Sequence, residues 1–158
     1  MESQLKKIMC PVDFSDPSER ALEEAVSLAK LNGAVLALIT VVQPLPATVG
    51  AEGTIIAEMR TTVPGMMTDM AEDYLNRMRD KQCAEIRDQT STQVAVGVPF
   101  VEIVRAAREF EADLIVMGSH GRTGLEHLLI GSVAERVVRK APCSVLVVRD
   151  KARQFVMP

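Results

Sequence analysis

Glycine is concentrated in one short stretch of the sequence, and a serine closes it. Four of the nine glycines lie between residues 118 and 131, and Ser132 follows the last of them directly. Glycine lets a backbone approach a ligand closely, and no side chain covers its amide. An amphipathic pattern starts at Val133, so the serine begins a predicted helix, where unpaired N–H groups and the helix dipole attract an anion. The stretch therefore predicts a phosphate-binding loop. A tight structural loop with glycine and serine caps is the alternative.

Asp13, at the end of the first apolar run, is the second candidate residue. A carboxylate there can accept hydrogen bonds from ribose hydroxyls or from the amino group of a base. The alternative is that Asp13 caps the following helix, and taken alone Asp13 fits that role better. Arg122, or a protonated His120, would add positive charge beside the glycines. About three or four charge-assisted hydrogen bonds from such a loop would hold a polyphosphate without any lysine contact.

Short apolar runs alternate along the chain with longer amphipathic ones. The apolar runs are typical of buried strands, which we expect at 8–12, 34–42, 93–96, 114–117 and 145–148. Asp16 is the predicted N-cap of the first helix, with Pro17 at its first position and Gly33 as its stop. Further helices are predicted over 67–78, 99–110 and 133–138, the last with Val133, Ala134, Val137 and Val138 facing inward.

Residues 43–65 are rich in proline and glycine and predict a long connection, with at most a short helical piece around 55–59. Loops of this length are often functional or mobile. The methionines in and after it, which include Met66, Met67, Met70 and Met78, have two interpretations. Their helical spacing favours core packing, and the alternative is an adaptable surface for a partner. Exposure of Met66 and Met67 distinguishes the two.

Strands that alternate with helices form βαβ units, so we expect a parallel sheet with right-handed crossovers and helices on both faces. Ligands bind such open sheets outside the carboxyl ends of the strands, where the strand order reverses. Residues 1–150 are expected to form a single domain with 43–65 as its one large excursion, and residues 151–158 a polar tail. The residues that directly follow each strand are therefore the informative ones.

Composition and charge exclude several classes of protein. The chain has 158 residues, 47% of them hydrophobic, and a formal net charge of −3. This charge argues against wholesale nucleic-acid binding, and four phenylalanines with one tyrosine offer few stacking platforms for single strands. The longest apolar run is too short for a membrane span, and no signal-peptide core follows Lys7. We expect a soluble cytoplasmic protein with neither nucleic-acid nor membrane partners.

Familiar catalytic and cofactor motifs are missing from the sequence. The three cysteines form no C-x-x-C pair, which argues against a disulfide framework or a zinc ribbon, and Cys10 and Cys143 fit small core residues. Walker A, a G-x-G-x-x-G after the first strand, G-x-S-x-G and H-E-x-x-H are absent. The two histidines stand seven residues apart without a cluster of metal ligands. The sequence indicates a binding site and no convincing catalytic machinery.

The glycine motif and its surroundings resemble the universal stress protein family over nearly the whole chain. Gly118-x-x-Gly121, followed after nine residues by Gly131–Ser132, is similar to the G-2x-G-9x-G-[S/T] signature of the family's ATP-binding branch. Three other segments resemble the family's first strand, the run before the signature and the last strand, and these are Pro11–Ser15, Ala112–Met117, and Ala141–Cys143 with Val145–Val148.

The resemblance implies a Rossmann-like α/β fold of the adenine nucleotide alpha hydrolase type, a five-stranded parallel sheet of order 3-2-1-4-5 with helices on both faces. It implies an ATP site in which Asp13 and Val41 face the adenine and ribose. Thr40 departs from the family, because many relatives carry histidine there. Mg²⁺ or Mn²⁺, if used, would be held through the phosphates. The implied nucleotide-binding residues are Pro11, Val12, Asp13, Thr40, Val41, Met117, Gly118, His120, Gly121, Arg122, Gly131, Ser132 and Val133.

The resemblance also implies a homodimer formed largely through the last strand, Val145, Leu146, Val147 and Val148. The order 3-2-1-4-5 leaves this apolar strand at an open edge, which invites pairing. The leading hypothesis is an ATP-binding dimeric stress protein that acts as a nucleotide-responsive regulator rather than as an enzyme. One alternative is a dimeric interaction protein of the same fold that binds no nucleotide. Another is a slow ATP hydrolase, for which Asp13 is the only obvious carboxylate.

Overall fold

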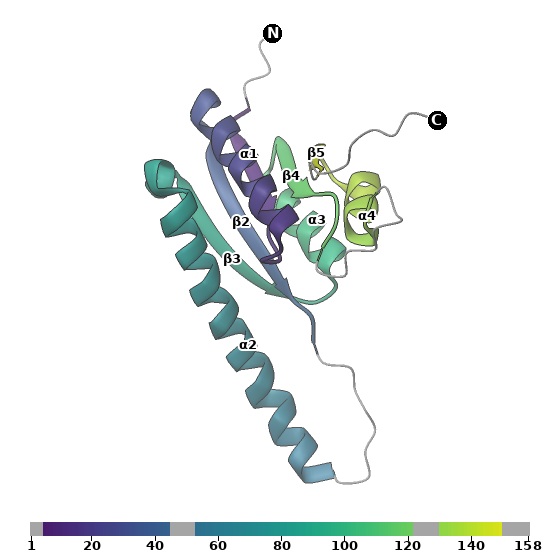
Figure 1. Cartoon of the computed structure of the whole chain (residues 1–158). Helices are drawn as coiled ribbons and strands as arrows, with labels where there is room; N and C mark the ends of the chain where they lie inside the picture. The colour runs from purple at the N-terminus through teal and green to yellow at the C-terminus, as the bar shows by residue number, and fades with distance from the viewer. Residues whose placement is uncertain (1–4, 45–52, 122–129, 150–158) are drawn as a thin grey trace, which may run out of the picture.

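Five parallel strands form one sheet in the computed structural model (Figure 1). They are β1 (Lys7–Pro11), β2 (Val35–Val42), β3 (Thr90–Val96), β4 (Leu114–Gly118) and β5 (Ser144–Val148), in the order β3-β2-β1-β4-β5. The structure describes residues 5–44, 53–121 and 130–149, and over 53–63 the backbone alone. The predicted tail at 151–158 and Arg122 lie outside the described residues. The strand order confirms the expected α/β fold.

The central strand β1 is buried on both faces, which explains its uninterrupted apolar sequence. Met9 lies opposite Ala37 of β2 and Ile115 of β4 in the parallel register. Because successive side chains of a strand point to opposite faces, Ile8 and Cys10 enter one apolar cluster and Met9 enters another. The sheet therefore separates two cores, and each needs its own helical cover.

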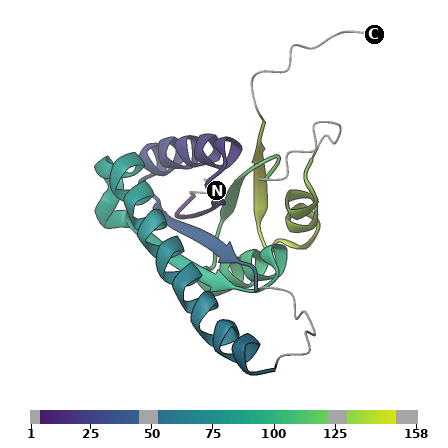
Figure 2. The same cartoon turned by 60° about the horizontal axis from the view of Figure 1, so that its bottom comes forward.

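Figures 1 and 2 show helices packed against both faces of the sheet. α1 (Asp16–Asn32) and α2 (Gly53–Gln82) supply side chains to the core that holds Ile8, and α3 (Pro99–Phe110) and α4 (Ser132–Lys140) to the core that holds Met9. A short 3₁₀ helix, η1 (Ala84–Gln89), joins α2 to β3. Within the described residues, no helix is both long and apolar enough to cross a membrane.

Helix α1 begins directly beyond the turn that follows β1. Ser15 is its N-cap, so the predicted cap Asp16 is wrong by one position and instead lies in the first turn. A carboxylate in the first turn is still stabilised by the positive end of the helix dipole. The helix ends as predicted at Gly33, whose φ of 61° is left-handed and whose N–H donates to the carbonyl of Ala29. The turn at 13–15 is thereby held between a buried strand and a capped helix.

Helix α2 overturns the prediction that 43–65 is a connection. The helix begins at Gly53 and runs through Pro64 to Gln82, and Figure 1 shows its first half extending beyond the strands. A proline inside a helix removes one backbone hydrogen bond and can kink it without ending it. The hydroxyl of Thr68 donates to the carbonyl of Pro64 over 2.8 Å, on the C-terminal side of the proline. Proline and glycine were therefore misleading as stop signals here.

The methionines of α2 do not all enter the core, so the interpretation as core packing is wrong for Met66, Met67 and Met70. Met66, Met67 and Met70 are 58%, 39% and 68% exposed, whereas Met78 is buried. The helix meets the sheet with its second half, where Leu75 joins the same core as Met78. The exposure at 66–70 therefore follows from where the helix meets the sheet.

Helix α4 differs from the prediction at one of its four apolar positions. Ala134 and Val137 are buried as expected, and Val133 packs partly against the core beside them. Val138, predicted to face inward, is 48% exposed. Adjacent positions of a helix point about 100° apart, so Val138 cannot share the buried face that Val137 occupies.

Candidate functional site

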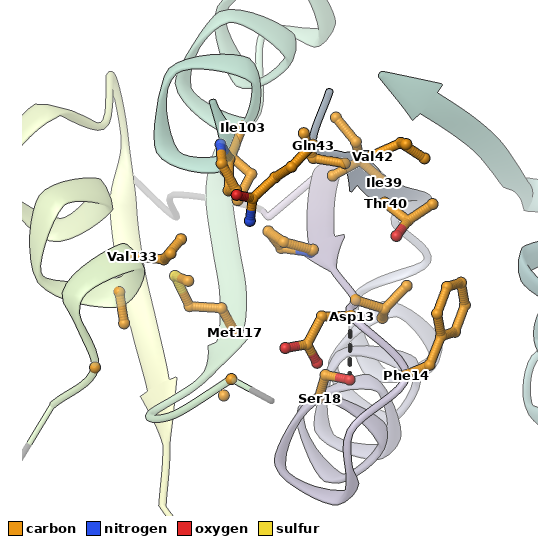
Figure 3. A pocket seen from close by; sticks show the side chains of 18 of the residues that line it. Asp13, Phe14, Ser18, Ile39, Thr40, Val42, Gln43, Ile103, Met117 and Val133 are labelled. Atoms are coloured by element: carbon orange, nitrogen blue, oxygen red, sulfur yellow. Dashed lines mark hydrogen bonds between the residues drawn. The ribbon is translucent and has the colours of Figure 1, made fainter. Parts of the chain in front are cut away.

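A cavity of about 840 Å³ lies at the carboxyl edge of the sheet (Figure 3). The ends of β1, β2 and β4 line it together with the first residues of α4. The chain proceeds from β1 to β2 on one side and places β4 on the other, so the strand order reverses at this point. Ligand pockets measure about 300–1,000 Å³, and those of open α/β sheets sit at such a reversal. The cavity has the size and the position of a ligand site.

The structure brings nearly all of the predicted nucleotide-binding residues together around this cavity. The exception is Arg122, which lies outside the described residues. The predicted nucleotide-binding residues that line the cavity are Pro11, Val12, Asp13, Thr40, Val41, Met117, Gly118, His120, Gly121, Gly131, Ser132 and Val133. Their grouping follows from the sheet topology, while their contact with a nucleotide stays a prediction.

Gly131 ties the start of α4 to the end of β4. Its N–H donates to the carbonyl of Ser119 over 2.6 Å. A Cβ at this position would lie 3.2 Å from the Ser119 oxygen and 3.4 Å from the Cα of His120, so a side chain would press on the chain beside β4. Glycine is required here because two backbone segments approach each other closely.

The start of α4 presents unpaired backbone donors. Gly131 is the N-cap in extended backbone and supplies no side-chain cap, and the N–H of Glu135 donates to its carbonyl as an intrahelical bond. The amides of Ser132, Val133 and Ala134 precede that bond and have no carbonyl partner within the helix. All three of these residues line the cavity. The positive end of the α4 dipole therefore faces the cavity, as an anion site requires.

The two carboxylate oxygens of Asp13 face different parts of the chain. One accepts hydrogen bonds in the turn before α1, and the other lies toward the glycine-rich segment. The N–H and the hydroxyl of Ser15 both donate to Oδ1, and the N–H of Asp13 donates to the Ser18 hydroxyl over 3.3 Å. The other oxygen, Oδ2, would lie 2.8 Å from a Cβ added to Gly121. Asp13 thus orders the turn before α1 but does not cap the helix, because Ser15 is the N-cap and no side chain among the described residues makes a cap bond. It also presents an oxygen toward Gly121.

The first glycine of the motif, Gly118, lines the cavity and also allows close packing against α1. A Cβ there would lie 2.9 Å from the backbone C and O atoms of Pro17 at the start of α1. Beyond it, Ser119 is buried, and its hydroxyl and His120 Nδ1 are 3.0 Å apart. Ser119 lines the cavity although the sequence analysis did not select it, and its place between two selected residues was the signal.

Other lining residues carried weaker signals in the sequence. Ile39 and Ile103 line the cavity from β2 and α3, and the strand and helix periodicities alone could have placed them on this face. Phe14 and four residues of α2 line it as well, and these are Met67, Met70, Ala71 and Tyr74. The α2 residues could not be found from local patterns, because their position depends on where a long helix meets the sheet.

Charge and metal chemistry are sparse around the cavity. Among the described residues, no group of three or more His, Cys, Asp or Glu side chains could hold a metal ion. Lysine and arginine are also absent from the described lining, where the charged side chains are those of Asp13 and Glu19. Positive potential for an anion thus comes from backbone amides and the helix dipole among these residues.

A parallel sheet with a glycine-lined crevice at its topological switch point places the chain in the class of open α/β proteins, whose ligand sites lie at that position. Within that class the assignment is specific, because the model of the universal stress protein family matches residues 4–149. The chain belongs to this family.

Two relatives from Methanocaldococcus jannaschii carry the same family name. Universal stress protein MJ0531 is 38% identical over 97% of this chain and 87% of its own length. Universal stress protein MJ0577 is 30% identical over 96% of this chain and 99% of its own length. Identity at this level over nearly complete chains supports a shared fold throughout.

Solved structures agree with this. The structure of MJ0577 has a TM-score of 0.79 at 31% identity and covers 95% of this chain and 99% of its own. The universal stress protein UspA from Lactobacillus plantarum has a TM-score of 0.72 at 27% identity, covering 93% and 99%. A universal stress protein solved in complex with cAMP has a TM-score of 0.64 at 27% identity, covering 93% and 98%.

Proposed function

We propose that this protein binds ATP in the cavity and acts as a dimeric, nucleotide-responsive stress regulator. The observation that carries the proposal is the junction at which Gly131 and Gly121 approach Ser119 and Asp13, since it leaves donors and a carboxylate oxygen beside an open cavity. The relative solved with cAMP supports an adenine nucleotide as the ligand class.

The start of α4 would hold the phosphates. The amides of Ser132, Val133 and Ala134 are available there, and the Ser132 hydroxyl adds a further donor. Gly131 keeps the approach open, because any side chain would fill the space beside Ser119 and His120. Charge-assisted hydrogen bonds contribute about 1.5–3 kcal/mol each before costs, so a few of them suffice for a polyphosphate. Mg²⁺ or Mn²⁺ would be bound through the phosphates and water rather than through a protein ligand set.

The part of the cavity next to Asp13 and the ends of β2 and β4 would hold the nucleoside. Asp13 Oδ2 is placed to accept a hydrogen bond from a ribose hydroxyl. Ile39, Val41 and Met117 offer an apolar surface for the base, and all three belong to the core covered by α3 and α4. Burial of an aromatic base against such side chains contributes through the hydrophobic effect.

Backbone hydrogen bonds connect the proposed phosphate site to the edge strand β5. The N–H of Ser119 donates to the carbonyl of Val148 at the end of β5 over 2.9 Å, and the carbonyl of Ser119 accepts from Gly131. Ser119 is therefore hydrogen-bonded to Gly131, at the proposed phosphate site, and to Val148 of β5. We propose that two copies pair through β5. A ligand shifts a dimer equilibrium only by its differential affinity for the two states, and this contact is where such a difference would arise.

Thermal unfolding with and without millimolar ATP tests the proposal. At a hundredfold excess over the dissociation constant, ATP should stabilise the fold by about 2.7 kcal/mol and raise Tm by several degrees. Gly131→Arg should abolish this shift, because the arginine side chain would occupy the space beside Ser119 and His120. Gly65→Arg is the matched control, since a Cβ at Gly65 meets nothing within 4 Å, and it should keep the shift.

Three other outcomes would count against the proposal. Absence of any shift, together with absence of co-purified nucleotide, would favour the interaction protein that binds no nucleotide. An equal shift in Gly131→Arg would place the ligand elsewhere. Steady release of phosphate that is lost in Asp13→Ala would instead support the slow hydrolase.

A further inference from the structure

The cavity has two arms, and only one of them faces the glycine-rich segment. Ile39 and Val41 belong to the core under α3 and α4, so Thr40 and Val42 between and after them lie on the α1–α2 side of β2. Figure 3 shows the same division after β1, where Asp13 and Phe14 point to opposite sides. We call the second part the apolar arm, lined by Phe14, Ser18, Glu19, Thr40, Val42, Met67, Met70, Ala71 and Tyr74.

Aromatic and methionine side chains dominate the apolar arm. The rings of Phe14 and Tyr74 have centroids 5.1 Å apart at an interplanar angle of 59°. Phe14 has a φ of 63°, a left-handed conformation that a bulky residue rarely adopts and that surrounding packing must maintain. Tilted ring pairs and thioethers both make favourable contacts with a further aromatic ring. The arm is therefore suited to an aromatic guest.

The hydroxyl of Thr40 opens onto the apolar arm (Figure 3). Thr40 is 4% exposed, and its hydroxyl makes no hydrogen bond to any part of the chain that the structure describes. Figure 3 shows that hydroxyl on the Phe14 side of β2. A hydroxyl that opens onto a cavity without a protein partner can bond a group from outside, and such a bond adds specificity as well as affinity.

We propose that the apolar arm binds a small uncharged aromatic molecule that carries one hydroxyl group, which the Thr40 hydroxyl recognises. The charged side chain in the described lining of this arm is Glu19, so an anion is disfavoured there. Phosphate-bearing ligands belong to the other arm, next to α4. The apolar arm is a separate site and stands whether or not the nucleotide arm binds ATP. Thr40, one of the predicted nucleotide-binding residues, has its side chain in this arm and not in the nucleotide arm.

Methionine methyl groups report on the two arms separately. The protein is labelled with ¹³C-methyl methionine and titrated with 2-naphthol, with assignments from single Met→Leu variants. Met67 and Met70 line the apolar arm, Met117 lines the nucleotide arm, and Met66 is exposed on α2 outside the cavity. Naphthol should shift Met67 and Met70 saturably, with a dissociation constant on the order of 1 mM. Met66 should stay unchanged, and ATP in a separate titration should move Met117 first.

Two variants and one anionic analogue test the recognition itself. Thr40→Val keeps the shape and removes the hydroxyl, and it should weaken naphthol about three- to tenfold. Ala71→Leu should fill the arm and abolish the shifts, while Ala84→Leu, exposed and outside the cavity, should not. The anionic analogue 2-naphthoate, with a carboxylate in place of the hydroxyl, should bind more weakly than naphthol.

The proposal fails if naphthol shifts none of the arm methionines, if Met66 responds as strongly as Met67, or if Ala71→Leu leaves binding intact. Stronger binding of naphthoate would also overturn it, since it would indicate an anion site. Failure of ATP to move Met117 would count against the nucleotide proposal alone, so the two failures are distinguishable.

Discussion

The amide of Gly131 donates to the carbonyl of Ser119 over 2.6 Å, and this bond brings the first turn of α4 beside the end of β4. Twelve positions of sequence separate the two residues, and neither is part of a regular strand or helix pairing. The bond explains why glycine precedes the serine of the motif, because a Cβ would crowd the Ser119 oxygen at 3.2 Å. The same geometry directs the free amides of α4 into the cavity.

Gly118 makes a comparable approach on the other side of β4, and replacing it should destabilise the fold. Its added Cβ would lie 2.9 Å from backbone atoms of Pro17, so Gly118→Ala should lower the free energy of unfolding by about 1–3 kcal/mol. Gly65→Ala in α2 is the control, because open space surrounds that position, and it should stabilise by about 0.5–1 kcal/mol. Urea unfolding midpoints at constant m-value measure both. Equal midpoints for the two variants would contradict this packing role.

The fold could be predicted from the sequence because its strongest signals are local. Continuous apolar runs gave the strands, and Pro17 and Gly33 marked the first helix within one residue of its observed ends. Proline failed as a signal at Pro64, because a helix interior tolerates the loss of one hydrogen bond and the chain continues as α2. Residues that line the cavity directly after a strand, such as Asp13, could be placed there for the same local reason. Tyr74 and Met70 were not, because they reach the cavity through the placement of α2.

Asp113 should make the free energy of unfolding depend on pH in the acid range. Its Oδ2 accepts the N–H groups of Lys6 and Lys7, each over 2.9 Å, and these bonds hold the pKa of the carboxyl below its usual 3.8. The unfolded chain therefore binds this proton at a higher pH than the folded chain does. The stabilisation is present above about pH 4 and is lost as the pH falls through the lowered folded pKa.

Asp113→Asn should therefore lower stability by about 1 kcal/mol at pH 7 after solvent screening, and its difference from the wild type should close in acid. Denaturant unfolding from pH 7 down to pH 2 gives the curve. Asp69→Asn, at an exposed carboxyl of α2, should change little at any pH. A difference for Asp113→Asn that stays constant into acid would rule out the charge as its origin.

The cysteines should react in an order set by burial. Burial raises the pKa of Cys83 to about 11, and burial likewise raises the pKa of Cys10 far above its usual value. At pH 8 the Cys83 thiolate is then about one part in a thousand of the total, so it reacts slowly even where reagent reaches it. Cys143, whose pKa burial also raises, is partly exposed.

Iodoacetamide at pH 8, followed by peptide mass spectrometry, should modify Cys143 first. Cys10 and Cys83 should be modified only when the protein unfolds, and in denaturant all three should react at similar rates. Early modification of Cys10 in the native protein would contradict its position in the core between β1 and the helices.

The outer edge of β5 is where we expect two copies to pair, and Leu146 tests it. Among the described residues β5 pairs with β4 alone, and Leu146 is 40% exposed between the half-buried Val145 and Val147. Across a two-fold axis the same residue meets its own copy or near neighbours, so Leu146→Asp introduces two like charges into one interface.

The dimer should weaken about tenfold to a hundredfold in Leu146→Asp, which sedimentation velocity over a range of protein concentrations would measure. Leu31→Asp changes an 82% exposed leucine on α1 and should leave the dimer intact. A wild-type protein that sediments as a monomer, or a Leu146→Asp variant as dimeric as Leu31→Asp, would refute pairing through β5.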